Sequence, residues 1–126
     1  MKKAKLLIID DEAELVSTLT ERLNLRGYDA HGVTNFIDGI KLLNETPDVV
    51  ILDIGLQDMD GMEILKKIKE INPTIQVIMM SGYGDVERIN KSLMHGAYDY
   101  LIKPVDIDEL VSKIDNAKLK RGTMQC

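Results

Sequence analysis

The chain has 126 residues, which is enough for one domain with its own hydrophobic core but not for two. Apolar residues make up 44% of the chain and charged residues 29%, and this composition excludes a disordered tail and a fibrous repeat. The 21 acidic and 16 basic residues leave a net charge of −5, which argues against nucleic-acid binding by this domain itself. The single cysteine, Cys126, excludes an internal disulfide framework, and no apolar run approaches the roughly 20 residues needed to cross a membrane. We therefore expect a cytoplasmic domain that does not enter the membrane.

Five short apolar segments predict β-strands. Residues 5–10, 49–53 and 76–80 are apolar almost throughout and end in a polar or sulfur-containing residue, as is typical of strands buried on both faces of a parallel sheet. Residues 28–33 and 98–102 mix polar and apolar side chains, so we expect these two strands nearer the edges of the sheet.

Apolar residues at helical spacing follow each predicted strand. Leu15, Leu19 and Leu23 recur at every fourth residue, which predicts the first helix. Four further apolar faces are formed by Phe36, Ile37, Ile40 and Leu43, by Ile64, Leu65, Ile68 and Ile71, by Val86, Ile89 and Leu93, and by Ile107, Leu110, Val111 and Ile114.

Glycines, prolines and acidic residues mark the predicted helix ends. Gly27, Pro47, Pro73 and Gly96 follow the first four helices, while Asp60 and Asp106, each with a Glu three residues later, resemble helix N-termini. The predicted order is therefore (βα)5, an α/β fold with a doubly wound parallel sheet and helices on both faces. We assign residues 1–120 to this domain and residues 121–126 to a C-terminal tail or the start of a linker.

Polar side chains gather at the carboxyl ends of the predicted strands, where ligands bind in such sheets. Asp10, Asp11, Asp53, Ser81 and Lys103 each end or directly follow a strand. Two carboxylates about 4 Å apart repel by about 4 kcal/mol at an effective dielectric constant of about 20, so such a cluster takes up a proton or a cation. Oxygen ligands without sulfur or imidazole favour a hard divalent ion, and Mg²⁺ leaves coordination positions for water and phosphate. Taken singly, Asp10 or Asp11 is better explained as a cap of the next helix.

Lys103 and Ser81 change that interpretation when they are considered with the carboxylates. The lysine can neutralise a bound anion as a point charge, and the serine offers a hydroxyl donor beside it. With Asp53 as an in-line nucleophile, the set forms a site for placing a phosphoryl group on a carboxylate. Alone, Lys103 would be explained as a solvated surface lysine.

The order and spacing of these residues are typical of one protein family. The full set consists of Asp10-Asp11, Asp53, Met59-Asp60-Gly61, Ser81-Gly82-Tyr83-Gly84-Asp85, Gly96-Ala97-Tyr98-Asp99-Tyr100 and Lys103-Pro104. Over about residues 5–118 the chain resembles a response-regulator receiver domain of two-component phosphorelay signalling. The resemblance implies a flavodoxin-like sheet with the strand order 2-1-3-4-5 and a cis bond before Pro104.

The resemblance also implies a phosphoacceptor and a metal site. Asp53 would accept a phosphoryl group from the phosphohistidine of a histidine kinase or phosphotransfer protein. Asp11, Asp53 and the backbone carbonyl of Gly55 would ligate Mg²⁺, with Asp10 acting through water. The domain would then be a phosphorylation-dependent switch that assists its own phosphoryl transfer and dephosphorylation, and not a conventional enzyme.

The remaining implied roles concern signal output. Ser81 and Lys103 would hold phosphoryl oxygens, and Tyr100 would be the switch aromatic. Movement of Ser81 would let Tyr100 rotate inward and remodel the face made by residues 85–118, where a partner or a second copy in a homodimer could dock. The alternative is that Tyr100 is only a packed aromatic of an edge strand.

Three positions depart from the common family pattern or vary within it. Gln57 stands where proline is common, so the loop after Asp53 is expected to be less rigid. Gly55 leaves no side chain over the phosphoryl site, and Tyr83 occupies the other variable flank. Both bear on the lifetime of the phospho-aspartate.

Three other functions share parts of this pattern. A haloacid-dehalogenase-like phosphatase would need a second Asp two residues after the nucleophile, where this chain has Gly55. A flavodoxin-like flavin binder would need a Gly/Ser/Thr-rich phosphate loop after the first strand, where this chain has three acidic residues. A pure interaction module would never turn over phosphate, and the intact site argues against it.

Overall fold

We describe the chain from a computed structural model, which covers residues 3–57, 59–82 and 84–125. Five parallel strands form one sheet in the order β2-β1-β3-β4-β5, which confirms the implied order and places the two mixed strands at the edges. Each strand agrees with its predicted segment to within one residue at either end. The strands are β1 (Lys5–Ile9), β2 (Asp29–Val33), β3 (Val49–Asp53), β4 (Gln76–Ser81) and β5 (Asp99–Ile102).

One helix follows each strand, as the apolar spacing predicts. The helices are α1 (Ala13–Leu25), α2 (Phe36–Leu43), α3 (Gly61–Ile71), α4 (Val86–Met94) and α5 (Ile107–Gln125). Asp60 caps α3, because its side chain accepts a hydrogen bond from the backbone N–H of Met62. Gly27 follows α1 with a φ of 95°, a conformation that glycine adopts without the strain of a side chain.

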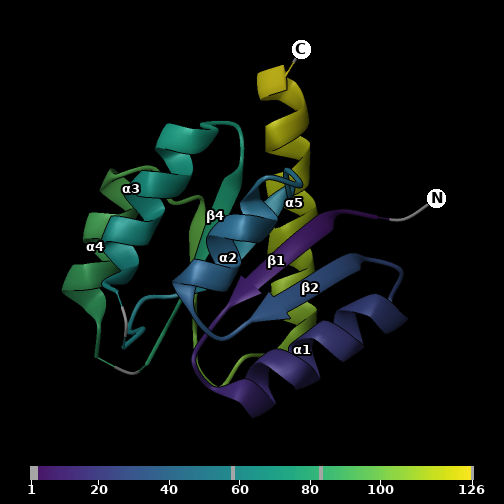
Figure 1. Cartoon of the computed structure of the whole chain (residues 1–126), viewed down its shortest axis with the longest axis horizontal. Coiled ribbons are helices and arrows are strands. Elements are labelled where there is room, and N and C mark those ends of the chain that lie inside the picture. Colours follow the sequence, from purple (N-terminus) through teal and green to yellow (C-terminus); the bar gives the residue numbers. More distant parts are fainter. Residues whose placement is uncertain (1–2, 58, 83, 126) are drawn as a thin grey trace.

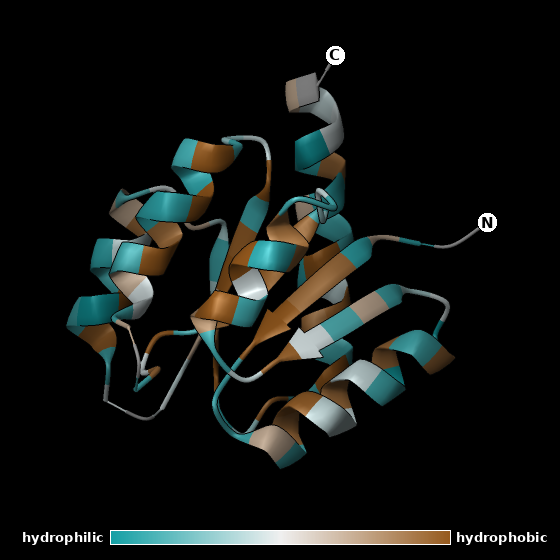
Figure 2. Cartoon of the chain, in the orientation of Figure 1, coloured by the Kyte–Doolittle hydropathy of each residue, from teal (hydrophilic) through white to brown (hydrophobic). Residues whose placement is uncertain are grey.

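The helices cover both faces of the sheet, as Figure 1 shows. Leu6 and Ile8 of β1 face a core cluster that includes side chains of α1 and α5. Leu7 and Ile9 face a second cluster, which includes side chains of α2 and α3. Figure 2 shows β1 largely in the hydrophobic colour, whereas the helices alternate hydrophilic and hydrophobic residues. Burial on both faces therefore explains why β1 and β3 are continuously apolar.

The end of α5 extends further than the apolar pattern indicates. Residues 121–125, which the sequence assigns to a tail or linker, continue the helix. Arg121 is only 6% exposed and donates a hydrogen bond of 2.7 Å to Asp48, directly before β3. The division of the chain at residue 120 stays a prediction about domain organisation.

Within the described part of the chain, no helix combines the length and the apolar character needed to span a bilayer.

Candidate functional site: the carboxyl ends of the strands

The strand ends bring the predicted polar residues to one edge of the sheet. Asp53 is the last residue of β3 and Ser81 the last residue of β4, while Asp10 and Lys103 directly follow β1 and β5. The backbone ladder continues to the site, because the N–H of Asp10 donates to Val33 and the N–H of Lys103 donates to Ser81. Regular strand pairing thus fixes the backbone positions of these candidate site residues.

Three carboxylates converge at the centre of this edge. Asp10, Asp11 and Asp53 each contribute an oxygen, and these oxygens lie within 4.8 Å of one another. Asp10 is fully buried and Asp53 is 6% exposed, whereas Asp11 is more accessible. Burial is the largest effect on Asp10 and, with the charge of Asp53, it raises the pKa of Asp10 above its ordinary value despite hydrogen bonds from Lys103 and Glu12. The donor set is all oxygen and carries excess negative charge, so it fits a hard divalent cation such as Mg²⁺.

Asp10 does not cap α1, because Glu12 is the N-cap residue and no side chain of the described residues accepts a capping hydrogen bond there, but Asp10 bonds to the backbone just before the helix. Its Oδ1 accepts a hydrogen bond of 2.8 Å from the backbone N–H of Glu12, the residue before α1. Its Oδ2 lies 2.8 Å from Nζ of Lys103. One oxygen of Asp10 thus bonds to the backbone before α1, and the other faces Lys103.

Lys103 is the cation of the site. Its Nζ lies 2.8 Å from Oδ2 of Asp10, 2.8 Å from Oε1 of Glu12 and 3.5 Å from Oδ2 of Asp53. Burial acts to lower the pKa of Lys103, but the hydrogen bonds to Asp10 and Glu12, with the charges of Asp10 and Asp53, outweigh it and hold the pKa above its ordinary value. The ammonium group therefore stays charged and faces the carboxylate of Asp53. The Lys103–Pro104 bond is cis, as the resemblance implies.

Glu12 is a partner of Lys103 that the sequence analysis did not identify. The two residues are 91 positions apart, and the Glu12 side chain is 61% exposed. The only available signal was the run of three acidic residues after β1, which does not indicate which of them meets the lysine. In this structure one lysine is shared among three carboxylates.

Ser81 ends β4, the strand next to β3, and Gly55 follows Asp53 in the chain, so both contribute polar groups to this edge. The hydroxyl of Ser81 is fully buried and has no hydrogen-bond partner among the described residues. The backbone N–H of Gly55 donates a hydrogen bond of 3.1 Å to Oδ1 of Asp53. A buried hydroxyl without an acceptor is costly, so Ser81 is ready to donate to an anion at this edge.

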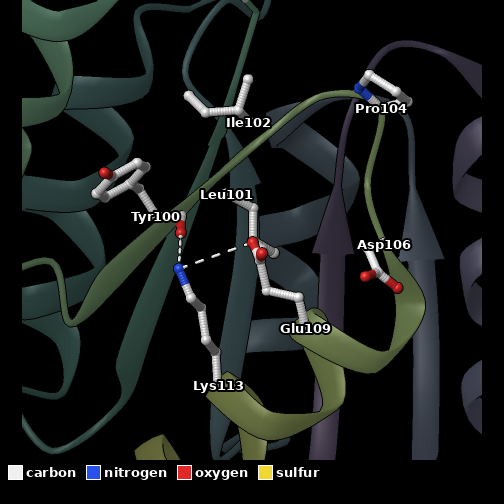
Figure 3. A pocket seen from close by; sticks show the side chains of 7 residues that line it. All are labelled: Tyr100, Leu101, Ile102, Pro104, Asp106, Glu109 and Lys113. Carbon is white, nitrogen blue, oxygen red and sulfur yellow. Dashed lines mark hydrogen bonds and ion pairs between the residues drawn. The ribbon is translucent and has the colours of Figure 1, made fainter.

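Tyr100 lies away from this site, on the outer part of β5. Its side chain is 36% exposed, and Nζ of Lys113 lies 5.0 Å from the centre of its ring. Figure 3 shows Tyr100 and Ile102 on one side of β5 and Leu101 on the other, with Lys113 of α5 reaching toward the backbone of Tyr100. A cavity of about 390 Å³ beside the Tyr100 ring is lined by Gly84, Val86, Ile89, Asn90, Tyr100 and Ile102. The face between α4 and α5 therefore has an open space beside the predicted switch residue.

The positions that depart from the family pattern lie at the surface where they are described. Gly55 and Gln57 are both exposed in the loop between β3 and α3. Tyr83 lies outside the described residues. The expected effects on loop rigidity and on phospho-aspartate lifetime stay predictions.

Known proteins resemble this chain in sequence. The family described as "Response regulator receiver domain" matches residues 6–115. The chain is 37% identical to the DNA-binding transcriptional regulator NtrC of Proteus hauseri over 93% of its own length but only 25% of that protein. It is 39% identical to Sporulation initiation phosphotransferase F of Bacillus subtilis, covering 87% of this chain and 90% of that protein. The chain thus spans a quarter of one relative and nearly all of the other.

Solved structures agree with the sequence comparisons. A response regulator receiver domain protein from Clostridium thermocellum superposes with a TM-score of 0.91 at 32% identity, covering 97% of this chain and 99% of the other. The receiver domain of NtrX from Brucella abortus gives a TM-score of 0.85 at 30% identity, covering 90% and 98% of the two chains. Phosphorylation-dependent switching in two-component signalling is the role of this family. With its fold, its acidic strand-end cluster and its match over residues 6–115, the chain belongs to the response-regulator receiver domains.

Proposed function

We propose that Asp53 is the phosphoacceptor of this receiver domain and takes its phosphoryl group from a phosphohistidine of a histidine kinase or phosphotransfer protein. The single observation that carries the proposal is the position of Asp53: its carboxylate lies beside two other carboxylates and 3.5 Å from the Lys103 ammonium. A carboxylate in such surroundings can meet a phosphorus atom whose oxygens are neutralised by cations.

The transfer exchanges one bond for another at phosphorus. An oxygen of Asp53 forms the new P–O bond while the P–N bond to the histidine breaks, and the imidazole nitrogen keeps the electron pair. The Gly55 N–H holds Oδ1 of Asp53, which leaves Oδ2 facing Lys103. The chain assists this transfer, and later dephosphorylation, mainly by position and charge.

Lys103 and Ser81 would receive the phosphoryl oxygens. Lys103 can exchange its contact with Glu12 for a contact with a phosphoryl oxygen. The exchange costs little, because the exposed carboxylate of Glu12 is then hydrated by solvent. Ser81 gains the acceptor that its buried hydroxyl lacks among the described residues. Both changes favour the phosphorylated state over the unphosphorylated arrangement of these side chains.

We assign Asp11, Asp53 and the Gly55 backbone carbonyl as protein ligands of Mg²⁺, with Asp10 acting through water. Bound Mg²⁺ would offset the charge of the carboxylates and of the phosphoryl oxygens. The converging carboxylate oxygens and the raised pKa of Asp10 support this assignment.

For the output, we propose that Ser81 is drawn toward the phosphoryl group and that Tyr100 rotates inward. The support is the Ser81 hydroxyl, which has no partner in the described part of the chain, together with the 36% exposure of Tyr100 and the cavity that Tyr100 lines. The rotation would remodel the face of α4, β5 and α5 and alter binding of a partner or of a second copy. We place this switching in the cytoplasm, where kinase phosphohistidines are formed.

The test is phosphorylation by acetyl phosphate with Mg²⁺, followed by intact-mass measurement. We expect the wild type to gain one phosphoryl group that hydroxylamine removes, and Asp53→Asn to gain none. Asp108→Asn is the matched control, because Asp108 is 86% exposed at the start of α5 and should leave labelling unchanged. Undiminished labelling of Asp53→Asn would place the acceptor elsewhere, and an unlabelled wild type would favour an interaction module.

A further inference from the structure

The peptide unit between Ile54 and Gly55 connects α4 to the carboxylate of Asp53. On one side its N–H, which belongs to Gly55, donates a hydrogen bond of 3.1 Å to Oδ1 of Asp53. On the other side its carbonyl, which belongs to Ile54, accepts a hydrogen bond of 2.6 Å from Nη2 of Arg88 in α4. One rigid plane therefore joins the Arg88 guanidinium to the Asp53 carboxylate.

Neighbouring elements leave this peptide little freedom. The N–H of Ile54 donates to the carbonyl of Met80 in β4, and the Ile54 side chain is 1% exposed. Its carbonyl also accepts a bond of 3.3 Å from the N–H of Gly61. A Cβ at Gly61 would lie 2.7 Å from the Ile54 Cα, so the start of α3 packs directly against this residue. A displacement of the Ile54 carbonyl therefore also moves the Gly55 N–H, because the loop has little freedom to adjust.

Arg88 has an acidic residue on each side. Its Nη2 lies 3.4 Å from Oδ1 of Asp60, which caps α3, and its Nη1 lies 4.0 Å from Oδ1 of Asp85, before α4. The side chain is 42% exposed, so these outer ion pairs are weak. The short bond to the Ile54 carbonyl is therefore the contact most sensitive to the position of α4.

We propose that Arg88 is a positioning residue that couples the location of α4 to the readiness of Asp53 to accept a phosphoryl group. The proposal rests on the proposed function of Asp53. A charged donor on the carbonyl polarises the peptide and strengthens its N–H as a donor to Asp53. That bond fixes the carboxylate rotamer in which Oδ2 faces Lys103.

The coupling acts in both directions, because it is a free energy shared by two sites. A partner that binds α4 and keeps Arg88 on the Ile54 carbonyl holds Asp53 in its accepting orientation. A partner that draws α4 away releases the peptide and slows phosphorylation. Any rearrangement of Asp53 on phosphorylation equally changes the affinity of α4 for such a partner.

The experiment compares the wild type with Arg88→Ala and Arg88→Lys. Lys91→Ala is the matched control, because Lys91 is an exposed cation one turn further along α4. The first readout is the amide proton shift of Gly55, which reports the bond to Asp53 without any phosphoryl transfer. The second is the labelling rate with acetyl phosphate at saturating Mg²⁺, and melting temperatures show that each variant is folded.

We expect Arg88→Ala to move the Gly55 resonance upfield and to slow labelling about tenfold, since misplacing a reacting group has costs of this order or more. Arg88→Lys should recover part of both effects, because an ammonium can still donate to the carbonyl. Lys91→Ala should match the wild type in both.

The proposal is overturned if Arg88→Ala keeps either the wild-type labelling rate or the wild-type Gly55 resonance. If the wild type itself is not labelled, the proposed function of Asp53 fails, and the Gly55 resonance alone then decides whether Arg88 orients this peptide.

Discussion

Asp48 lies where the amino ends of the strands meet (the amino edge of the sheet), and Asp10 lies where their carboxyl ends meet (the carboxyl edge). The two carboxylates differ in how far their negative charge is compensated. Asp48 precedes β3 and accepts hydrogen bonds from the Lys5 N–H at 2.8 Å, from Arg121 at 2.7 Å and from Lys118 at 3.2 Å. Burial acts to raise the pKa of Asp48, but these three donors outweigh it and hold the pKa below its ordinary value.

For Asp10, burial outweighs the hydrogen-bond donors. It is fully buried beside Asp53, and it shares its only side-chain cation, among the described residues, with Glu12 and Asp53. Its pKa is raised. At the amino edge the fold has satisfied a carboxylate completely, and at the carboxyl edge it has left charge that a cation can neutralise. Natural proteins commonly sacrifice stability in this way where they bind ligands.

The largest expected effect is at the amino edge. Asp48→Asn should lower the free energy of unfolding by about 2 kcal/mol, because it leaves the buried Arg121 without its carboxylate. Urea unfolding at pH 7 measures the change. Lys118→Ala is the control and should cost at most about 0.5 kcal/mol, because Lys118 is 48% exposed. Equal losses in the two variants would mean that Asp48 acts only as a surface charge.

The pH dependence of the same variant sharpens this test. Because the pKa of Asp48 is lowered by folding, its contribution is fully present above the ordinary value of 3.8 and is lost as the pH falls through the lowered pKa. The stabilities of wild type and Asp48→Asn should therefore converge in acid. Curves that stay parallel from pH 7 to pH 2 would contradict the assignment.

The sequence predicts the carboxyl edge better than the amino edge. Strand ends can be located from apolar segments that stop at polar residues, and parallel strands bring those ends together. For this reason the amino-acid pattern alone assigns Asp10, Asp11, Asp53, Ser81 and Lys103 to one site. The pattern also predicts a Mg²⁺ site and Asp53 as a nucleophile, whereas the individual metal ligands, the phosphohistidine donor and the switch role of Tyr100 came from the resemblance.

The contacts that the sequence did not predict join polar groups, of side chains or of the backbone, that are far apart in the chain. Arg121 and Asp48 are 73 residues apart, and Arg88 and Ile54 are 34 apart. Apolar periodicity carries no information about such pairs. The same cause explains the end of α5, where the predicted apolar face stops at Ile114 and polar contacts such as that of Arg121 hold the later turns against the sheet.

An intermediate effect is expected at the carboxyl edge, with the opposite sign. Asp10→Asn should raise the free energy of unfolding by about 1 kcal/mol in EDTA, because it removes a buried charge that is incompletely compensated. The asparagine oxygen can still accept the hydrogen bond from the Glu12 N–H.

Added Mg²⁺ should reduce the stability advantage of Asp10→Asn over wild type. Wild type should gain about 1.4 kcal/mol at ten times its dissociation constant, and Asp10→Asn should gain less at the same concentration. Denaturant unfolding with and without Mg²⁺ measures both quantities. If Asp10→Asn is less stable than wild type in EDTA, Lys103 compensates the charge of Asp10 fully. The two edges would then not differ in charge compensation.

The smallest expected effect separates two fully buried serines. The Ser92 hydroxyl donates a hydrogen bond of 2.7 Å to the Ile89 carbonyl, whereas the Ser81 hydroxyl has no partner among the described residues. Ser92→Ala should therefore cost about 0.5 kcal/mol, and Ser81→Ala should be neutral or stabilising by about 0.5 kcal/mol.

With beryllofluoride as a phosphoryl mimic, Ser81→Ala should gain less stability than wild type, because the alanine cannot donate to the ligand. Calorimetric melting with and without the mimic measures both differences. If Ser81→Ala is as costly as Ser92→Ala and gains as much from the mimic as wild type, the Ser81 hydroxyl has a purely structural partner, and its buried position is no sign of a site waiting for an anion.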